Sequence, residues 1–561
     1  MRQKGKNKSS KHKLSIIPLG GIGEIGKNMF VVQYQQEIIV LDAGLMFPEE
    51  EMLGVDIVIP DISYLLENRD KVKAIILSHG HEDHIGALPF ILPRLNVPVY
   101  GTKLTLGLLK YKLEESGILG ETALHEIKAG QEIKVGSMKI GFFATNHSIP
   151  DSVGMVFKTP LGNVVYTSDF KFDHTPVNGN ITDFYQLSKI GQEGVLVALS
   201  DSTNAERPGY THTEKEVGQT LNDIFCSAEG RIIIVTFASN IHRVQQIVNA
   251  ASSSNRKLAI DGWSMVNNVE IARDLGFLEI PPNTLIDIEE IRKIPNDQTA
   301  LLTTGTQGEP MSALTRLSNA NHRKFEISTG DTVVIAATPI PGNEKLVSRT
   351  IDNLYRRGAK VIYETLSGVH VSGHGSREDL KMMLNLLKPK YLIPVHGEYR
   401  HLFHHGKIAE EVGINQDNIF IVENGNVIEF TPSQARVMPS VQAGYVFVDG
   451  LGVGDVGSVV LRDRQVLSKD GIFIVVVTFD SKEMKVISGP DIVSRGFVYV
   501  KESEELLEEA KEKVTKVLEE MMDKNISDWT TIKNSVKESV NKLLWEKTGR
   551  KPMILPIIME I

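Results

Sequence analysis

Short hydrophobic runs separated by glycine, proline and aspartate dominate residues 14–215, a pattern typical of β-strands joined by tight turns. Four of these runs are rich in valine and isoleucine and are predicted strands: 29–33, 38–41, 72–77 and 164–166. Together they indicate a mixed sheet.

Residues 216–365 have a different pattern, in which hydrophobic runs are followed by amphipathic stretches of helical length. Strands are predicted at 231–236 and 331–337, and helices at 241–251 and 345–357. Alternating strands and helices are typical of an α/β unit, so we expect a separate domain here.

Short hydrophobic runs between turn residues return at 366–430, which contains a predicted strand at 391–395. Residues 431–455 are rich in glycine, proline and serine, which favours a linker. A last module is expected at 456–561.

Within this last module, strands are predicted at 471–479 and 496–500, and a helix at 503–522. On the helix, hydrophobic residues recur at spacings of three and four: Leu507, Ala510, Val514, Val517 and Met521. Glutamate and lysine fill its other faces, so the hydrophobic stripe is interpreted as a core face.

Composition places the chain among soluble, multidomain proteins. It has 561 residues, 41% of them hydrophobic and 23% charged, and at about 150 residues per domain this length gives roughly three to four domains. No hydrophobic run reaches the roughly 18 residues of a membrane span, so we expect no membrane association. We identify no signal peptide and expect a cytoplasmic location.

Cysteine and charge narrow the chemistry further. Cys226 is the only cysteine, which excludes internal disulfides and thiolate metal clusters. The net charge is −9, so a nucleic-acid partner would need local basic surface, and the basic residues within 2–13 are one source. Any metal must be bound by histidine, aspartate or glutamate.

One motif near the start is misleading. Residues 21–26 match GxGxxG and Asp42 follows, which superficially resembles a dinucleotide-binding unit. That unit needs a helix between the glycines and the acidic residue, whereas 29–41 is predicted to form two strands. We therefore expect the glycines to shape a turn close to another backbone segment.

The strongest chemical signal is the HxHxDH motif at 79–84, directly after the predicted strand 72–77. Imidazoles and carboxylates suit zinc, manganese or iron. On a tight loop, the first two histidines can face one ion while the aspartate and last histidine face a second, at the spacing of a two-metal site.

Four ligands cannot complete two metal sites, so ligands from other strand ends are required. His147, Asp169 and His396 each follow a predicted strand, where α/β sheets gather functional residues. We assign His79, His81 and His147 to one ion, Asp83, His84 and His396 to the other, and Asp169 as the bridge. Because the chain must leave and return between Asp169 and His396, residues 216–365 are an insertion, and a cleft beside it would accommodate a polymeric substrate.

These residues resemble the metallo-β-lactamase fold with a β-CASP insertion, and further segments resemble bacterial ribonuclease J. The segments are LGGIGEIGKN at 19–28, DSTN at 201–204, FASNIHR at 237–243, TGTQGEP at 304–310, PIPGN at 339–343, SGHG at 372–375, HGEYR at 396–400 and KPMILP at 551–556. The resemblance covers nearly the whole chain. It implies an α/β fold: an αββα sandwich (14–215 and 366–430), an inserted β-CASP α/β domain (216–365) and a small C-terminal α/β domain after the linker.

The resemblance implies a two-metal ribonuclease of RNA decay and of rRNA and mRNA processing. Its expected activity is 5′-to-3′ exonuclease action favouring 5′-monophosphate ends, together with endonuclease action on single-stranded RNA. The implied cofactors are two zinc ions, or manganese, bound by the seven ligands above, and a calcium ion near Asp449.

The catalytic residues implied are Asp83, Asp201 and His374. On chemical grounds Asp83 would hold or accept the proton of the attacking water, and His374 would stabilise the phosphate or protonate the leaving oxygen. The substrate-binding residues implied are Ser239, Asn240, Ile241, His370, Val371, Ser372, Gly373 and His374. Two positions depart from the family pattern: Trp263 stands where arginine is usual, and Ser168 where glycine is usual.

Other functions stay open. The chain could be a catalytically idle RNA-binding subunit that pairs with a paralogue, a DNA nuclease, or a hydrolase of thioesters or lactams, although the last needs neither the insertion nor the C-terminal module. RNA and DNA differ at the 2′-hydroxyl, and no residue in the sequence indicates which of the two is bound. A homodimer or homotetramer formed through the C-terminal module is expected, or a hetero-oligomer with a paralogue.

Overall fold

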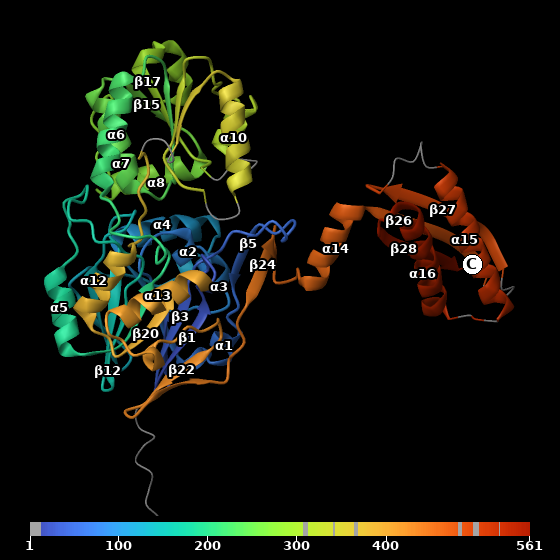
Figure 1. Ribbon diagram of the computed structural model, residues 1–561, viewed down its shortest axis with the longest axis horizontal. Coiled ribbons are helices and arrows are strands. Elements are labelled where there is room, and N and C mark those ends of the chain that lie inside the picture. Colours follow the sequence, from blue (N-terminus) through green and yellow to red (C-terminus); the bar gives the residue numbers. More distant parts are fainter. Residues whose placement is uncertain are drawn as a thin grey trace, which may run out of the picture. The chain divides into compact units, whose positions relative to one another are not determined.

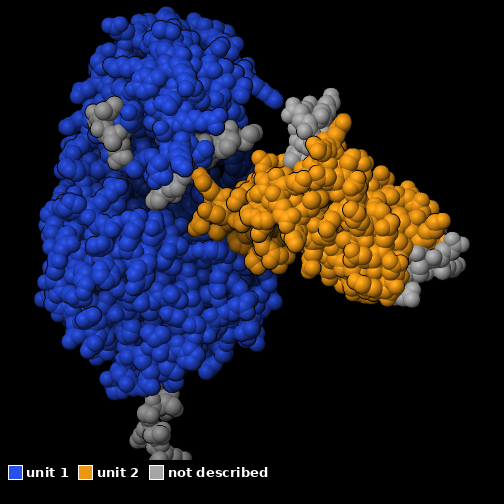
Figure 2. Space-filling model, turned by 45° about the vertical axis from the view of Figure 1, so that its right-hand side comes forward, with its two compact units in different colours: residues 1–47, 57–446 blue, residues 48–56, 447–561 orange. Residues whose placement is uncertain are grey.

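The structure is a computed structural model that describes residues 13–306, 312–339, 343–363, 368–480, 485–497, 504–524, 526 and 528–560. The chain forms two compact units, which Figure 2 shows in different colours. The larger unit comprises residues 1–47 and 57–446, and the smaller comprises 48–56 and 447–561.

Two sheets packed face to face form the body of the larger unit (Figure 1). The first has the order β23 (Ala435–Met438), β22 (Val427–Phe430), β1 (Leu14–Gly20), β3 (Met29–Tyr34), β4 (Glu37–Leu41), β6 (Val72–Ile76), β7 (Val99–Gly101) and β8 (Leu124–Glu126). The second has the order β20 (Tyr391–Val395), β13 (Val195–Asp201), β12 (Gly162–Tyr166), β11 (Val153–Thr159), β10 (Met138–Ala144) and β9 (Glu132–Val135). Phe30, Phe142, Tyr166 and Phe430 are among the buried side chains between them.

Helices cover the outer faces of both sheets, which completes the predicted αββα sandwich. Hydrophobic residues of α5 (Phe184–Glu193), α12 (Arg377–Leu387) and α13 (Tyr399–Glu411) pack on the second sheet. The other helices of this region are α1 (Ser63–Glu67), α2 (Glu82–Ile85), α3 (Leu88–Ile91) and α4 (Lys103–Glu115), and a short strand β5 (Ile57–Pro60) precedes α1.

The chain leaves the sandwich after β13 and returns in β20. The two strands are parallel neighbours, with Asp201 in register with Val395, although the whole insertion lies between them. This pairing is what brings Asp201 and His396 to the same edge of the sheet, as the predicted insertion requires.

The insertion is a parallel sheet flanked by helices (Figure 1). Its strand order is β16 (Leu285–Ile286), β15 (Lys257–Ile260), β17 (Thr299–Thr303), β14 (Ile232–Val235), β18 (Thr332–Ile335) and β19 (Lys360–Tyr363). Its helices are α6 (Glu214–Ser227), α7 (Ile241–Ser253), α8 (Trp263–Asp274), α9 (Ala313–Ser318) and α10 (Glu344–Arg356).

The smaller unit begins within β24 (Tyr445–Asp449), of which it contains residues 447–449. It continues with β25 (Gly452–Val453) and α14 (Ser458–Asp470), followed by an α/β module. The module's sheet has the order β27 (Lys485–Arg495), β26 (Ile472–Asp480) and β28 (Met553–Glu560). Helices α15 (Glu504–Asp523) and α16 (Trp529–Thr548) bury Ala510 and Val514 against one face of this sheet, which agrees with the predicted stripe.

Two predictions for single segments need correction. Residues 431–455 are not simply a linker, because β23 pairs with β22 and extends the first sheet; the strand has only four residues and lies half-exposed at the sheet edge, so it carries little hydrophobic signal. The predicted strand 496–500 is wrong at its start, because β27 ends at Arg495 and Gly496 has a φ of 68° that breaks the extended backbone. Residues 498–500 lie outside the described residues.

In the part of the chain that the structure describes, no helix has the length and hydrophobicity needed to cross a membrane. The cytoplasmic location stays a prediction.

Candidate metal centre

The HxHxDH motif forms a tight loop between β6 and α2, at the edge of the first sheet. Ser78, His79 and His84 are fully buried, and His81 directly precedes α2. Gly80 allows the loop to pack closely against α4, since a Cβ there would lie 2.6 Å from the side chain of Leu108. The three histidines therefore project from one short segment toward the second sheet.

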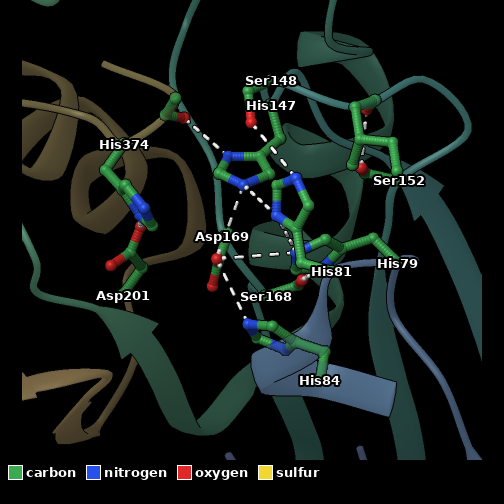
Figure 3. Close-up of polar contacts among 12 residues, drawn as sticks. His79, His81, His84, His147, Ser148, Ser152, Ser168, Asp169, Asp201 and His374 are labelled. Carbon is green, nitrogen blue, oxygen red and sulfur yellow. Dashed lines mark hydrogen bonds and ion pairs between the residues drawn. The ribbon is translucent and has the colours of Figure 1, made fainter. Parts of the chain in front are cut away.

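His79, His81 and His147 form the first ligand group, with Asp169 beside them (Figure 3). His81 Nδ1 lies 3.0 Å from His79 Nε2 and 3.1 Å from His147 Nε2. Asp169 Oδ2 lies 3.6 Å from both His79 Nε2 and His147 Nε2. Ligands of a tetrahedral zinc ion, with Zn–N near 2.0–2.1 Å, are about 3.4 Å apart, so this spacing suits one cation.

Asp83, His84 and His396 form the second ligand group, again with Asp169. His396 Nε2 lies 3.0 Å from Asp83 Oδ2, and His84 Nε2 lies 3.2 Å from Asp169 Oδ2. The same Asp169 oxygen thus borders both groups, which is the position predicted for a bridging ligand.

The donor set fits a divalent metal site. His147 donates its Nδ1 proton to the carbonyl of Gly373 over 2.9 Å, which leaves the lone pair of Nε2 directed at His81. Asp169 Oδ1 is buried and has no hydrogen-bond partner among the described residues. Converging lone pairs and an unpaired buried carboxylate oxygen are costly unless a cation binds them.

The two groups differ in their electrostatics. Burial holds the pKa values of His79 and His147 well below the usual histidine range and lowers the pKa of His81 to about 4. Burial opposes protonation of His396 too, but Asp169 and the hydrogen bond with Asp83 outweigh it and raise the His396 pKa to about 9. The first group therefore presents neutral imidazoles, the form that binds metal.

Carboxylates dominate the second group. Burial disfavours protonated His84, yet Asp169, Asp83 and Asp42 raise its pKa well above the usual value. Burial likewise disfavours a charged Asp169, and His396 and His84 overcome it, so the Asp169 pKa lies well below its usual range.

Asp201 and His374 lie on the third side of the centre (Figure 3). His374 Nδ1 donates to Asp201 Oδ2 over 2.8 Å, and the side chain of His374 is 19% exposed while that of Asp201 is 2% exposed. Burial opposes protonation of His374, but Asp201 raises its pKa above the usual value. His374 is thus a partly open histidine, oriented by a buried carboxylate, beside both ligand groups.

Asp42 is a site residue whose role the sequence did not reveal, because it stood out only as part of the misleading GxGxxG pattern. Its buried carboxylate accepts hydrogen bonds from His84 Nδ1 at 2.8 Å, Ser78 Oγ at 2.9 Å and the Tyr166 hydroxyl at 2.8 Å. An ionised carboxylate only accepts, so Asp42 fixes the proton of His84 on Nδ1 and turns Nε2 toward Asp169. The one feature of the sequence that could have identified Asp42 is its position at the end of a predicted strand.

The glycines of 21–26 do shape a close backbone contact, as predicted. Ile22 and Gly23 form β2 (Ile22–Gly23), which pairs with β21 (Gly397–Glu398), and the carbonyl of Gly21 accepts from His396 N over 2.8 Å. Thr203, another residue not singled out, places its hydroxyl 2.8 Å from His396 Nδ1 and 2.8 Å from Asp201 Oδ1. The Gly21 carbonyl therefore holds the backbone of His396, and the Thr203 hydroxyl holds its imidazole ring.

The expected substrate-contacting segments meet at the boundary with the insertion. Arg243 is fully buried, pairs with Glu214 at 2.8 Å, and reaches His370 Nδ1 at 2.7 Å and the carbonyl of Val371 at 3.3 Å. Ser372 Oγ accepts from the backbone of His374, and the Gly373 carbonyl holds His147. The loop 370–374 is therefore fixed between the insertion and the metal centre.

The other expected substrate residues have structural contacts of their own. Asn240 caps α7 through Arg243 N at 3.0 Å, Ser239 immediately precedes it, and Ile241 is buried, so its side chain is not open to a ligand. Asp449 pairs with Arg464 and belongs to none of the candidate metal groups found among the described residues. Ser168 adopts a φ of 56° and places its hydroxyl 3.3 Å from His79 Nδ1.

A cavity of about 1110 Å³ borders His147. Segments 144–153 and 177–181 of the sandwich form one wall, and α7 with residues 276–281 of the insertion forms the other. The structure therefore has a space beside the metal centre between sandwich and insertion, as expected for a polymeric substrate.

Sequence models of known families match successive parts of the chain. They are the metallo-β-lactamase superfamily at 22–204, the ribonuclease J β-CASP domain at 229–354, the Zn-dependent metallo-hydrolase RNA specificity domain at 358–421 and the ribonuclease J C-terminal domain at 459–561. A crystal structure of a protein of unknown function from Enterococcus faecalis V583 has a TM-score of 0.53, with 17% identity over 74% of this chain and 100% of that one. That likeness concerns the fold alone.

Curated relatives cover the full length. Ribonuclease J2 of Bacillus subtilis (strain 168) is 51% identical over 99% of this chain and 100% of its own. Ribonuclease J 2 of Staphylococcus aureus (strain NCTC 8325 / PS 47) is 44% identical over 100% of this chain and 99% of its own. The chain therefore belongs to the ribonuclease J family of metal-dependent ribonucleases, which confirms the resemblance seen in its motifs.

Proposed function

We propose that the protein hydrolyses RNA phosphodiesters with two divalent ions, one in each ligand group. The observation that carries this proposal is the position of Asp169 Oδ2, within 3.6 Å of imidazoles in both groups. When bound, two such ions activate a water molecule at neutral pH and neutralise charge on the scissile phosphate.

The chain's own residues divide the remaining tasks. Asp83, the more exposed carboxylate of the centre at 30%, is placed to hold or accept the proton of the attacking water. His374 faces the ligand groups with its Nδ1 proton fixed on Asp201, so its Nε2 is free to hold a proton near the leaving oxygen. Asp201 thereby acts by positioning His374.

We propose single-stranded RNA with a 5′-monophosphate as the preferred substrate, degraded from its 5′ end and also cut internally, in RNA decay and in rRNA and mRNA processing. The resemblance to the family carries this finer statement, and the fixed loop 370–374 beside the candidate metal centre supports it. Backbone donors and small side chains at Ser372 and Gly373 suit phosphate oxygens.

Chelation followed by metal replacement tests the proposal. Purified protein treated with chelator should lose RNA cleavage and regain it with zinc or manganese, and each metal's activity identifies the working ion. Full cleavage after verified metal removal would contradict the proposal. Comparing RNAs with 5′-monophosphate, triphosphate and hydroxyl ends then tests the preference at the 5′ end.

The double variant Asp83→Ala, His84→Ala separates an active enzyme from an idle subunit. We expect it to fold and to degrade RNA at background rate, because one ligand group is destroyed. Equal RNA decay by this variant and the wild type would support the idle subunit. Matched single-stranded DNA serves as the second substrate, and faster loss of DNA would overturn the choice of RNA.

We also propose that the C-terminal module mediates self-association. On the sheet face opposite α15 and α16, Val493, Leu555 and Ile557 are 41%, 45% and 38% exposed. They belong to the two outer strands, and Ile474 of the central strand pairs with both Val493 and Leu555. A second copy of the chain would bury this hydrophobic face. Light scattering of a chain truncated near residue 450 tests this, and an unchanged oligomeric state would contradict it.

A further inference from the structure

An exposed indole and a half-buried phenol ring form a contact between the insertion and the sandwich. Trp263 is the first residue of α8 and is 62% exposed, and Tyr111 belongs to α4. Their ring centroids are 5.5 Å apart with planes at 54°. Asn267, one helical turn after Trp263, donates to the Tyr111 hydroxyl over 2.8 Å and holds the second ring in place. We call these two residues the aromatic pair.

The aromatic pair lies next to the metal-binding loop through α4. Leu108, one turn before Tyr111, fills the space that a Cβ on Gly80 of the loop would occupy. Lys112, directly after Tyr111, forms an ion pair with Glu82 in α2. Helix α8 packs on the same helix, since a Cβ on Gly107 would lie 2.5 Å from Leu275. Helix α4 therefore contacts both the metal-binding loop and the helix that carries Trp263.

The chemistry of the aromatic pair fits a nucleobase better than a phosphate. The exposed charges on this part of α4 are mixed, with Lys110 beside Glu114 and Glu115, so they do not form a cationic surface. An indole that is 62% exposed contributes little to the core. It does present a flat π-surface, and aromatic rings of this kind bind the bases of single-stranded nucleic acids by stacking.

We propose that the aromatic pair is a stacking site for one base of the single-stranded RNA substrate, outside the metal centre. The inference rests on the proposed function for the identity of the polymer. Stacking depends little on base identity, so the site would raise affinity for RNA of any sequence. Its loss should raise KM and leave kcat nearly unchanged, because the aromatic pair does not touch the reacting phosphate.

The experiment uses full-length protein freed of metal by chelator, so that RNA is bound without being cut. The chain has three tryptophans, and a Trp529→Phe, Trp545→Phe background leaves Trp263 as the only indole. Oligoadenylate carrying a 5′-phosphate should quench its fluorescence. In an anisotropy titration with labelled RNA, Trp263→Ala should weaken binding by roughly 5- to 150-fold, and Trp263→Phe should retain most of the affinity.

Abasic substitutions scanned along the RNA locate the stacked base. One position should weaken binding to the wild type and have no further effect on Trp263→Ala, because both changes remove the same contact. Tyr355→Ala is the matched control: Tyr355 is a 50% exposed aromatic of the same insertion, at the far end of α10. It should bind RNA as the wild type does.

The outcomes separate this inference from the proposed function. Unchanged affinity of Trp263→Ala, or RNA binding without quenching, overturns the stacking site while RNA cleavage by the metal-loaded enzyme stands. Quenching with the abasic effect, but no cleavage after metal is restored, supports the stacking site and counts against the nuclease. Absence of RNA binding by the metal-free protein overturns the stacking site, whereas cleavage by the metal-loaded enzyme decides the proposed function separately.

Discussion

The two ligand groups share Asp169 but differ in every other donor. The first adds three imidazoles, from His79, His81 and His147, whereas the second adds Asp83 and the imidazoles of His84 and His396. Imidazole favours zinc, and carboxylate oxygen also accommodates manganese. We therefore expect the two proposed ions to differ in metal preference, with the ion of the second group exchanging for manganese more readily.

Asp169→Ala should disable both ligand groups at once, because it removes the one ligand that they share. We expect loss of both ions and a fall in RNA cleavage of about 10³-fold or more, equivalent to about 4 kcal/mol. Metal analysis and cleavage assays measure the two effects. Asp223→Ala, an exposed aspartate of α6, is the control and should keep both ions.

Single substitutions test whether each group binds its ion independently. His81→Ala should release the ion of the first group and His396→Ala that of the second, each lowering cleavage by about 10²- to 10³-fold. Metal content measured for each variant should fall from two equivalents toward one. If either variant lost both ions, the two groups would not bind independently.

Manganese titration of these same variants tests their unequal chemistry. His81→Ala, which keeps the carboxylate-rich group, should take up manganese in place of zinc more readily than His396→Ala does. Competition between the two metals, followed by metal analysis, provides the ratio. Equal ratios for the two variants would show that the donor type does not govern the choice.

Asp42→Asn acts on the second group indirectly, through the orientation of its ligand His84. The variant keeps the shape of the side chain but removes the charge that orients His84, so metal affinity or activity should fall about 10- to 100-fold. Metal affinity at the second group is the readout that distinguishes this role from simple destabilisation. Among the described hydrogen bonds, Asp42 contacts the second-group ligand His84 directly but reaches the first-group ligand His79 only through Ser78. Tyr166→Phe, which removes one donor to Asp42, should have a smaller effect.

The sequence predicted the residues that the structure brings together as candidate metal ligands, because their chemistry is local. The HxHxDH motif places four donors in six residues, and His147, Asp169 and His396 each lie within three residues of the end of a strand whose hydrophobic pattern is plain. The insertion was predictable for a related reason, since Asp169 and His396 could meet only if the intervening chain left the sheet and returned.

Other features could not be predicted, because they depend on contacts between distant segments. Nothing in the residues around Asp42 or Thr203 shows that one orients His84 and the other His396. The aromatic pair likewise forms only when α4 and α8 pack together. The four-residue edge strand β23 was not predicted for a different reason. Its hydrophobic pattern is weak, and its pairing with β22 compensates for that weakness.

Substitutions of Ser168, which contacts the first group, should have the smallest effect on RNA cleavage. Its hydroxyl lies 3.3 Å from His79 Nδ1, and its φ of 56° is strained for any residue with a Cβ. Ser168→Ala removes the hydroxyl and keeps the strain, whereas Ser168→Gly removes both. Cleavage should fall less than about tenfold in each variant, and the glycine variant should be more stable than the alanine variant by about 1 kcal/mol in thermal unfolding. Equal stability would show that the surrounding loop already accommodates the left-handed backbone.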